Sequence, residues 1–303
     1  MRVDPNYSSN LVNYLDQVTA TEQKLTGELS SGVRVTSLSD DPVAAGENVV
    51  LLNQLQQDDS FTSNSDSLTA QLQVADSALG SVVTELTSAI SLATSANNGT
   101  MSSSNVKSVA SQLSGILSEV TSLANTAYQG QYIFAGSQTS SAPFTTTETG
   151  STSNTAYNGD TDINYIETPS GQKIQLNVPG STIFMGSGSN SVFGALNALI
   201  SDYSSGTVNT NQAVSDTEAL NTALNYLSGQ RVTIDNSINQ ISAASDALSS
   251  QETQLTTEQT DLLQSDTATV ATQLSTAESQ QTALEDVISE VDSSSNSLFS
   301  KLQ

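Results

Sequence analysis

The chain contains no cysteine and no histidine. Without cysteine it can form neither a disulfide nor a thiolate metal site, and without histidine it lacks the commonest metal ligand and general base. The G-x-S-x-G, G-x-x-x-x-G-K, G-x-G-x-x-G and H-E-x-x-H motifs are also missing from its sequence. We therefore expect no catalytic residue, no cofactor and no bound metal, and a protein that is not an enzyme.

Basic residues are scarce as well. The chain has only seven Lys and Arg residues but 31 Asp and Glu residues, which gives a formal net charge of −24. Binding to nucleic acid or to anionic lipid needs a basic surface, so neither is an expected partner. No run of about 18 apolar residues is present, and the segment 1–15 lacks the apolar core of a cleavable signal peptide. We expect no membrane span, and export by another route if the protein leaves the cell.

The sequence has no Trp and only 5% aromatic residues, which suits long, thin packing layers better than one large globular core. What it has instead is a seven-residue apolar period, which predicts a coiled-coil seam. The seam restarts one position later at Leu263, which resets its register. Its first part is Leu220, Leu227, Ile234, Ile241, Leu248, Leu255 and Leu262, and its second is Leu263, Val270, Ala277, Leu284, Val291 and Leu298.

Four further helices are predicted from apolar spacing and from their end signals. The first carries the stripe Leu11 to Leu29 and should end at Gly32, which can adopt the left-handed cap conformation. The second should begin at Asp41-Pro42, an N-cap followed by proline in the first turn, and continue to about Ala96. The third and fourth are predicted from Val106 to Ala127 and from Val192 to Tyr203.

Between about 137 and 191 the helical period is lost, and Gly, Pro, Thr and Asn become frequent. Strands at 163–168 and 173–178 are predicted to form a hairpin through Pro169-Ser170-Gly171, with Ile174, Leu176 and Val178 on the buried face. The run from Asn158 to Asn164 resembles the start of a calcium loop. Tyr165 replaces its required glycine, however, so turn residues leading into a strand are the favoured interpretation.

The predicted fold is mainly α: a long antiparallel coiled-coil bundle formed by both termini, with a small inserted β-rich domain. We predict a terminal helical assembly domain from 1–33 and 263–303, a helical rod domain from 34–136 and 192–262, and a β-rich outer domain at 137–191. Two terminal helices alone would leave apolar stripe exposed, which usually marks an assembly surface. The residues predicted to form it are Leu11, Leu15, Val18, Leu25, Leu29, Val270, Leu274, Leu284, Ile288, Val291, Leu298 and Leu302.

The residues also carry a resemblance to a known family. Leu29-Ser30-Ser31-Gly32-Val33-Arg34-Val35 and Asp40-Asp41-Pro42-Val43-Ala44-Ala45 resemble the N-terminal signature of the bacterial flagellin superfamily. The Met1-Arg2-Val3 start, Gln131-Tyr132-Ile133-Phe134-Ala135-Gly136-Ser137-Gln138 with Pro143-Phe144, and the ending Ser297-Leu298-Phe299-Ser300-Lys301-Leu302 are similar to its hook-associated branch.

The resemblance implies a structural adaptor between the hook and the filament of the bacterial flagellum, exported unfolded and located outside the cell. The implied partners are copies of the chain itself in a ring or helical layer, the other hook-associated junction protein, flagellin, and an export chaperone that binds the C-terminal helix. It also implies that Arg34, Asp40 and Asp41 lie at an elbow between subunits. The alternatives are a flagellin-type filament subunit, or a secreted acidic enzyme or adhesin that uses the β-rich insert.

Overall fold

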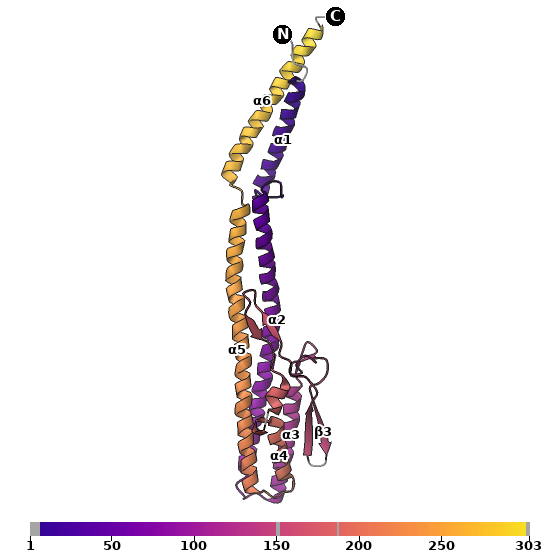
Figure 1. Cartoon of the computed structure of the whole chain (residues 1–303), viewed down its shortest axis with the longest axis vertical. Coiled ribbons are helices and arrows are strands. Elements are labelled where there is room, and N and C mark those ends of the chain that lie inside the picture. The colour runs from indigo at the N-terminus through magenta and orange to yellow at the C-terminus, as the bar shows by residue number, and fades with distance from the viewer. Residues whose placement is uncertain (1–6, 150–151, 187, 301–303) are drawn as a thin grey trace. The chain divides into compact units, whose positions relative to one another are not determined.

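The computed structural model of the chain describes residues 7–149, 152–186 and 188–300 (Figure 1). These residues form two compact units. One contains the described residues up to Gln56 together with those from Gln251 onward, and the other contains the described part of Gln57–Ser250. The α-helices are α1 (Tyr7–Ser31), α2 (Pro42–Ala96), α3 (Ser103–Ala124), α4 (Val192–Ser204), α5 (Thr210–Leu263) and α6 (Thr267–Ser300). None of these helices is both long and apolar enough to cross a membrane.

The predicted end of the first helix and the predicted start of the second coincide with the observed ones, because the cap residues act as their chemistry suggests. Gly32 has φ +70° and donates its N–H to the carbonyl of Glu28 at 2.8 Å, which ends α1. The Asp41 carboxylate accepts from the N–H groups of Val43 and Ala44 at 3.2 and 3.1 Å, which starts α2. Gly99 and Gly206, both at positive φ, follow the ends of α2 and α4.

The unit from 57 to 250 has one hydrophobic core, which is shared by α3, α4 and the parts of α2 and α5 within it. Leu79 and Leu86 of α2, Leu113 of α3 and Leu227 of α5 are fully buried in this core. The predicted seam of α5 therefore packs inside the molecule from Leu220 to Ile241, as its heptad spacing indicates.

An ion pair lies beside that seam, at Arg231, one turn after Leu227. Arg231 of α5 binds the carboxylate of Asp76 on α2 through two nitrogens, with Nη2 2.9 Å from Oδ2. This contact lowers the pKa of Asp76 and raises that of Arg231. Gly80 lies one turn after Asp76, and a Cβ built there would lie 3.6 Å from the guanidinium, which is an ordinary contact distance.

The one-residue step in the heptad series coincides with a break in the helix. α5 ends at Leu263 and α6 begins at Thr267. Asp266 caps the new helix, since its carboxylate accepts from the N–H groups of Ala268 and Thr269 at 3.0 and 3.3 Å. The change of register is therefore accommodated by ending one helix and starting another.

The third predicted helix is too long at its C-terminus. α3 ends at Ala124, and Ala127 lies in the short strand β1 (Ala127–Tyr128), which pairs with β2 (Gln131–Tyr132). The physical reason lies at Asn125. Its side chain donates to the carbonyl of Phe144 at 2.8 Å and accepts from the N–H of Phe144 at 2.9 Å, which fixes the chain at the entry to the insert.

The predicted hairpin is present but shorter. β5 (Tyr165–Glu167) pairs antiparallel with β6 (Lys173–Gln175), with Ile166 opposite Ile174. The predicted alternation fails at Asn177, which is buried. Its Nδ2 donates to the carbonyl of Asp162 at 3.1 Å and its Oδ1 accepts from the N–H of Asn164 at 2.7 Å, so side-chain bonds replace the strand ladder there.

The hairpin of β3 (Phe144–Thr149) and β4 (Thr152–Tyr157) was not predicted. The strands pair in register from Phe144 with Tyr157 to Thr149 with Thr152. Their sequence is rich in Thr, Ser and Asn and lacks a clear apolar alternation. This hairpin is held at its base, where the ring of Phe144 lies 5.1 Å from that of Tyr157.

The insert shares its core with the helices. Phe144 and Phe184, from the π-helical turn η1 (Ser181–Met185), both contact Phe193 of α4, with ring centroids 5.2 and 5.9 Å apart. A short 3₁₀ turn, η2 (Gly188–Asn190), leads into α4. All three rings are buried and belong to the same cluster as Leu79 and Leu113. The β hairpins are therefore attached to the helices through an aromatic layer.

Candidate assembly interface

The terminal helices α1 and α6 lie side by side in opposite directions (Figure 1). Among the described side chains, the core that they share is small. Leu25, Val270 and Ala277 are buried, with Val18 and Leu274 packed against them. The other predicted assembly residues lie along the same helices. Leu11 is buried, Leu15, Leu284, Ile288 and Val291 are half-buried, and Leu29 is exposed. Leu302 and the side chain of Leu298 lie outside the described residues.

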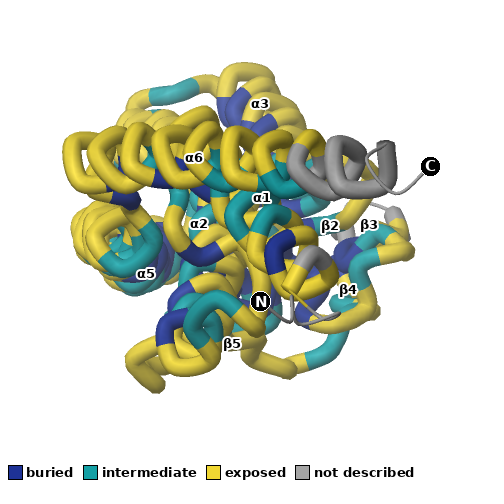
Figure 2. The backbone as a smooth tube through the Cα atoms, turned by 90° about the horizontal axis from the view of Figure 1, so that it is seen from above, coloured by how far each residue is buried: buried dark blue, intermediate teal, exposed yellow. Residues whose placement is uncertain are grey.

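Much of the surface of these two helices is exposed (Figure 2). Exposed apolar side chains lie on the outer sides of α1 and α6, namely Tyr7, Val12, Tyr14 and Val287. When only two helices pack together, each helix buries one stripe of its surface. In a bundle each helix packs against several neighbours and buries a larger part of its surface. The described part of α1 and α6 thus has apolar surface that the other described residues leave uncovered.

The connectors that precede α2 and α6 are tied to each other by backbone hydrogen bonds. Arg34 donates its N–H to the carbonyl of Leu263 at 2.7 Å, and Ser265 donates its N–H to the carbonyl of Gly32 at 2.9 Å. Val33 and Gln264 form an isolated antiparallel bridge. The predicted elbow residue Arg34 therefore lies beside the α5–α6 break.

Two ion pairs lie in the connector that contains this bridge. The Arg34 guanidinium lies 3.1 Å from the Asp41 carboxylate, and the Lys24 ammonium of α1 lies 3.0 Å from the Asp40 carboxylate. Asp40 also accepts from the N–H groups of Thr36 and Ser37 at 3.2 and 2.9 Å. The Lys24 contact and these hydrogen bonds hold the pKa of Asp40 well below its usual value. Both aspartates therefore have a structural role in the connector.

An apolar surface at the start of α2 was not predicted from the sequence. Val43, Val49, Val50 and Leu52 are each about half or more exposed, and so is Leu38 in the connector. Ala44 and Leu51 already fill the buried side of the helix. The signal was the run Val49-Val50-Leu51-Leu52, because four consecutive apolar residues cannot all face one seam.

Beside this surface is a groove of about 590 Å³ between α2 and α5. Its apolar lining comes from Val50 and Leu51 of α2 and Leu262 of α5. Its charged lining consists of three carboxylates, those of Glu47, Glu258 and Asp261. None of the three forms a salt bridge within the described residues.

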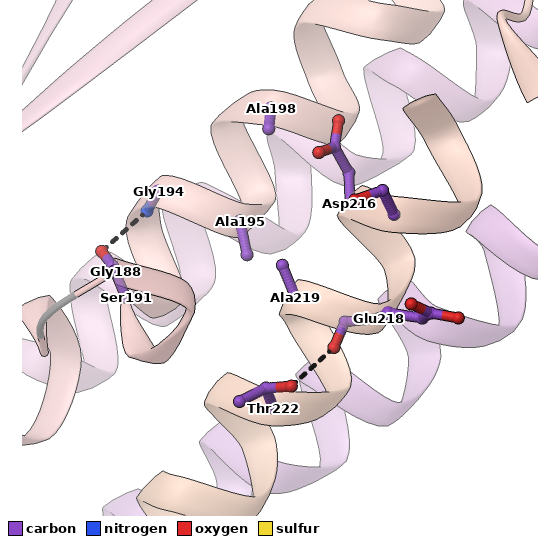
Figure 3. Close-up of a pocket in the computed structure, with 10 residues that line it drawn as sticks. Gly188, Ser191, Gly194, Ala195, Ala198, Asp216, Glu218, Ala219 and Thr222 are labelled. Carbon is purple, nitrogen blue, oxygen red and sulfur yellow. Dashed lines mark hydrogen bonds between the residues drawn. The ribbon is translucent and has the colours of Figure 1, made fainter. Parts of the chain in front are cut away.

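A second pocket, of about 530 Å³, lies between α4 and α5 (Figure 3). Small side chains line it, and Ser191 accepts from the N–H of Gly194 at 3.1 Å as the N-cap of α4. Asp216 also lines the pocket. Burial and the neighbouring Asp216 carboxyl raise the pKa of Asp202, which precedes the end of α4. The described residues contain no group of three acidic, His or Cys side chains that could hold a metal ion.

The residues considered as the start of a calcium loop have another role. The Asp160 carboxylate accepts from the N–H of Ser137 at 2.8 Å, from the Ser137 hydroxyl, and from the N–H of Asp162 at 3.1 Å. These bonds lower the pKa of Asp160. Gly136, next to Ser137, has φ +71° and no room for a Cβ, which would lie 2.0 Å from Asp160 Oδ1. Asp160 therefore stabilises the turn after β2.

Residues 5–139 match the family model described as the bacterial flagellin N-terminal helical region. Flagellar hook-associated protein 3 of Salmonella typhimurium is 30% identical over 122 residues, which are 40% of this chain and 38% of that protein. Its counterpart in Escherichia coli is 30% identical over 118 residues, which are 39% of this chain and 37% of that protein. Both alignments thus span less than two fifths of the relative's length.

Two solved structures share the fold. A putative flagellar hook-associated protein from Vibrio parahaemolyticus superimposes with a TM-score of 0.65 at 20% identity, over 74% of this chain and 100% of that chain. The flagellar junction protein of Legionella pneumophila gives a TM-score of 0.58 at 14% identity, over 72% and 99% of the two chains. The predicted fold class, long terminal helices around a small strand-containing region, is confirmed.

Proposed function

We propose that this chain, whose residues 5–139 match the bacterial flagellin N-terminal helical region, is a flagellin-type structural subunit that joins the flagellar hook to the filament. The curated relatives that it matches are both named flagellar hook-associated protein 3, and one structural neighbour is named a flagellar junction protein. On this proposal the protein has no enzymatic activity and works in the extracellular part of the flagellum.

One observation supports assembly most directly. Among the described side chains, the shared core of α1 and α6 consists of Leu25, Val270 and Ala277 with Val18 and Leu274 packed against it, while apolar side chains remain exposed on the outer sides. When neighbouring copies cover these side chains, apolar surface that is exposed in the single chain becomes buried, which stabilises the assembly. The proposed assembly residues are those named from the sequence, together with Arg34, Asp40 and Asp41 at the connector.

In this proposal the chain has three domains with different roles. Residues 1–33 and 263–303 form the assembly domain, 34–136 and 192–262 the rod, and 137–191 the outer part. Partners are further copies of this chain in a ring or helical layer, the other hook-associated protein on one side and flagellin on the other. Export proceeds in unfolded form, and a chaperone binds the C-terminal helix before export.

The decisive experiment uses purified full-length protein and short filament seeds. We expect the protein to bind seed ends in a limited layer without elongating them, and to bind hooks that carry the other hook-associated protein. Electron microscopy and sedimentation measure both events. Growth of long filaments from this protein alone would instead indicate a filament subunit, and failure to bind either structure would contradict the proposal.

A further inference from the structure

The groove between α2 and α5 has the chemistry of a docking site. Val50, on its lining, is 64% exposed, and Val43, two turns earlier on the same side of α2, is 70% exposed. The three lining carboxylates, which belong to Glu47, Glu258 and Asp261, have no cation bound to them in the described residues. An occupant that suits this groove presents an apolar side chain together with a positive charge.

The chain itself carries a surface of that kind on the β5–β6 hairpin. The cross-strand pairs are Tyr165 with Gln175 and Glu167 with Lys173. Tyr165 is 55% exposed and Ile163, just before β5, is 43% exposed. Lys173 is exposed and forms no salt bridge with any described residue. The opposite face, with Ile166 and Ile174, packs against the core.

We propose that the β5–β6 hairpin of one copy docks in the α2–α5 groove of a second copy. Tyr165 and Ile163 then lie on Val50 and Leu51, and Lys173 faces the carboxylates of Glu258 and Asp261. Aromatic side chains at the centre of a contact and charges at its rim are the usual arrangement of a specific interface.

Two features favour a second copy as the occupant. Apolar and charged groups are complementary between two surfaces of the same sequence, although the molecule as a whole is strongly acidic. The two surfaces are also different from each other, so the contact is head-to-tail and can propagate into a ring or a helical layer. The inference rests on the proposed assembly of identical subunits and assigns one contact within it.

Cysteine cross-linking tests the contact directly, because the chain has no cysteine of its own. Full-length Val50→Cys and Tyr165→Cys variants are mixed under oxidising conditions with hooks and filament seeds present. Any disulfide between the two variants joins two copies. We expect the mixture to give at least about tenfold more cross-linked dimer than Tyr165→Cys mixed with Val232→Cys, since docking raises the local thiol concentration. Val232 is a matched control, because it is 54% exposed on α5 outside the groove.

Charge reversal tests the ionic part. Glu258→Lys should lower the cross-linking yield by about fivefold, and Lys173→Glu in the partner variant should restore it. Glu119→Lys and Lys107→Glu change the same charges at exposed positions outside both surfaces and should have no effect. A structural defect in Glu258→Lys would persist with the Lys173→Glu partner, whereas loss of a specific pairing would be reversed.

The outcomes separate this inference from the proposed function. Dimers above the control yield, with rescue by the double reversal, support it. Copies that assemble by sedimentation but cross-link no better than the control overturn the hairpin contact and leave the junction role intact. If the wild-type chain assembles neither alone nor on hooks and seeds, the proposed function fails and the inference fails with it.

Discussion

At the scale of single residues, the connector before α2 shows one side chain with two roles. One oxygen of Asp41 caps the helix through Val43 and Ala44, and the other binds Arg34. The N–H of Arg34 in turn binds the carbonyl of Leu263, so the cap, the ion pair and the backbone bridge form one continuous network. Changes at Asp41 should therefore affect both the start of α2 and the end of α5.

We predict that Asp41→Ala exposes the first turn of α2 to exchange. The Val43 and Ala44 N–H groups lose their acceptor, so their hydrogen-exchange rates should rise while those of Leu79 and Leu86 stay unchanged. Asp41→Asn is the matched control, because an amide oxygen can still cap the helix but no longer forms an ion pair. Unchanged exchange in Asp41→Ala would show that the cap does not hold this turn.

A pH dependence is predicted at Asp40. Its pKa is lower in the folded chain than the ordinary 3.8, so its contribution to stability is present above that value and is lost as the pH falls below it. The amide NMR signals of Thr36 and Ser37, which donate to this carboxylate, should shift in that acidic range. In an Asp40→Asn variant the same shift should disappear, and its persistence would assign the titration to another group.

Tyr203 is the buried polar residue with the clearest energetic role. Its hydroxyl donates to Asn97 Oδ1 at 2.8 Å and lies 3.3 Å from the carbonyl of Ala93, and burial raises its pKa to about 12. Tyr203→Phe should lower the free energy of unfolding by about 1–2 kcal/mol, because Asn97 Oδ1 is left without this donor. Urea unfolding measures the change. Tyr14→Phe, at an exposed position, is the control and should be neutral.

At the scale of elements, the two helical layers differ in how much they bury. Leu79 of α2 is fully buried in the large core of its unit, whereas Leu25 of α1 belongs to a much smaller core among the described side chains. Leu79→Ala should destabilise the monomer by about 3 kcal/mol. Leu25→Ala should cost clearly less in the monomer, and a similar loss at both positions in thermal unfolding would contradict this difference.

The same difference predicts where proteases cut. Local opening requires little free energy where few apolar contacts are lost, so α1 and α6 should be cleaved in the monomer before α3 and α4. Limited proteolysis followed by mass spectrometry measures the order. Assembly on hooks should protect α1 and α6, and equal resistance of all four helices in the monomer would contradict the predicted order of cleavage.

At the scale of the whole molecule, charge controls how copies meet. A net charge of −24 makes the approach of two copies unfavourable at low ionic strength. Raising the salt concentration to about 0.15 M shortens the Debye length to about 8 Å, so self-association should become faster and begin at a lower protein concentration. Sedimentation at both salt concentrations measures this, and weaker association in salt would indicate that ion pairs between copies dominate.

Several elements could be predicted because their signals are local. Gly32, Asp41-Pro42, Gly99 and Gly206 mark helix ends through backbone conformation and capping, which depend on few neighbouring residues. The heptad spacing from Leu220 likewise identifies the buried side of α5. The β3–β4 hairpin lacks such a signal, because its Thr-rich strands are held by distant groups, Asn125 and the Phe144 ring cluster.

The sequence by itself determined the mainly helical fold, the seams and the resemblance to flagellin-type proteins, because these depend on period, caps and short motifs. Tertiary structure alone decided which apolar residues remain uncovered. Val50 of α2 looks like a core residue in the sequence, and only the positions of α5 and its carboxylates place it beside a groove. Exposure depends on what packs against a residue, and that neighbour can be two hundred positions away in the chain.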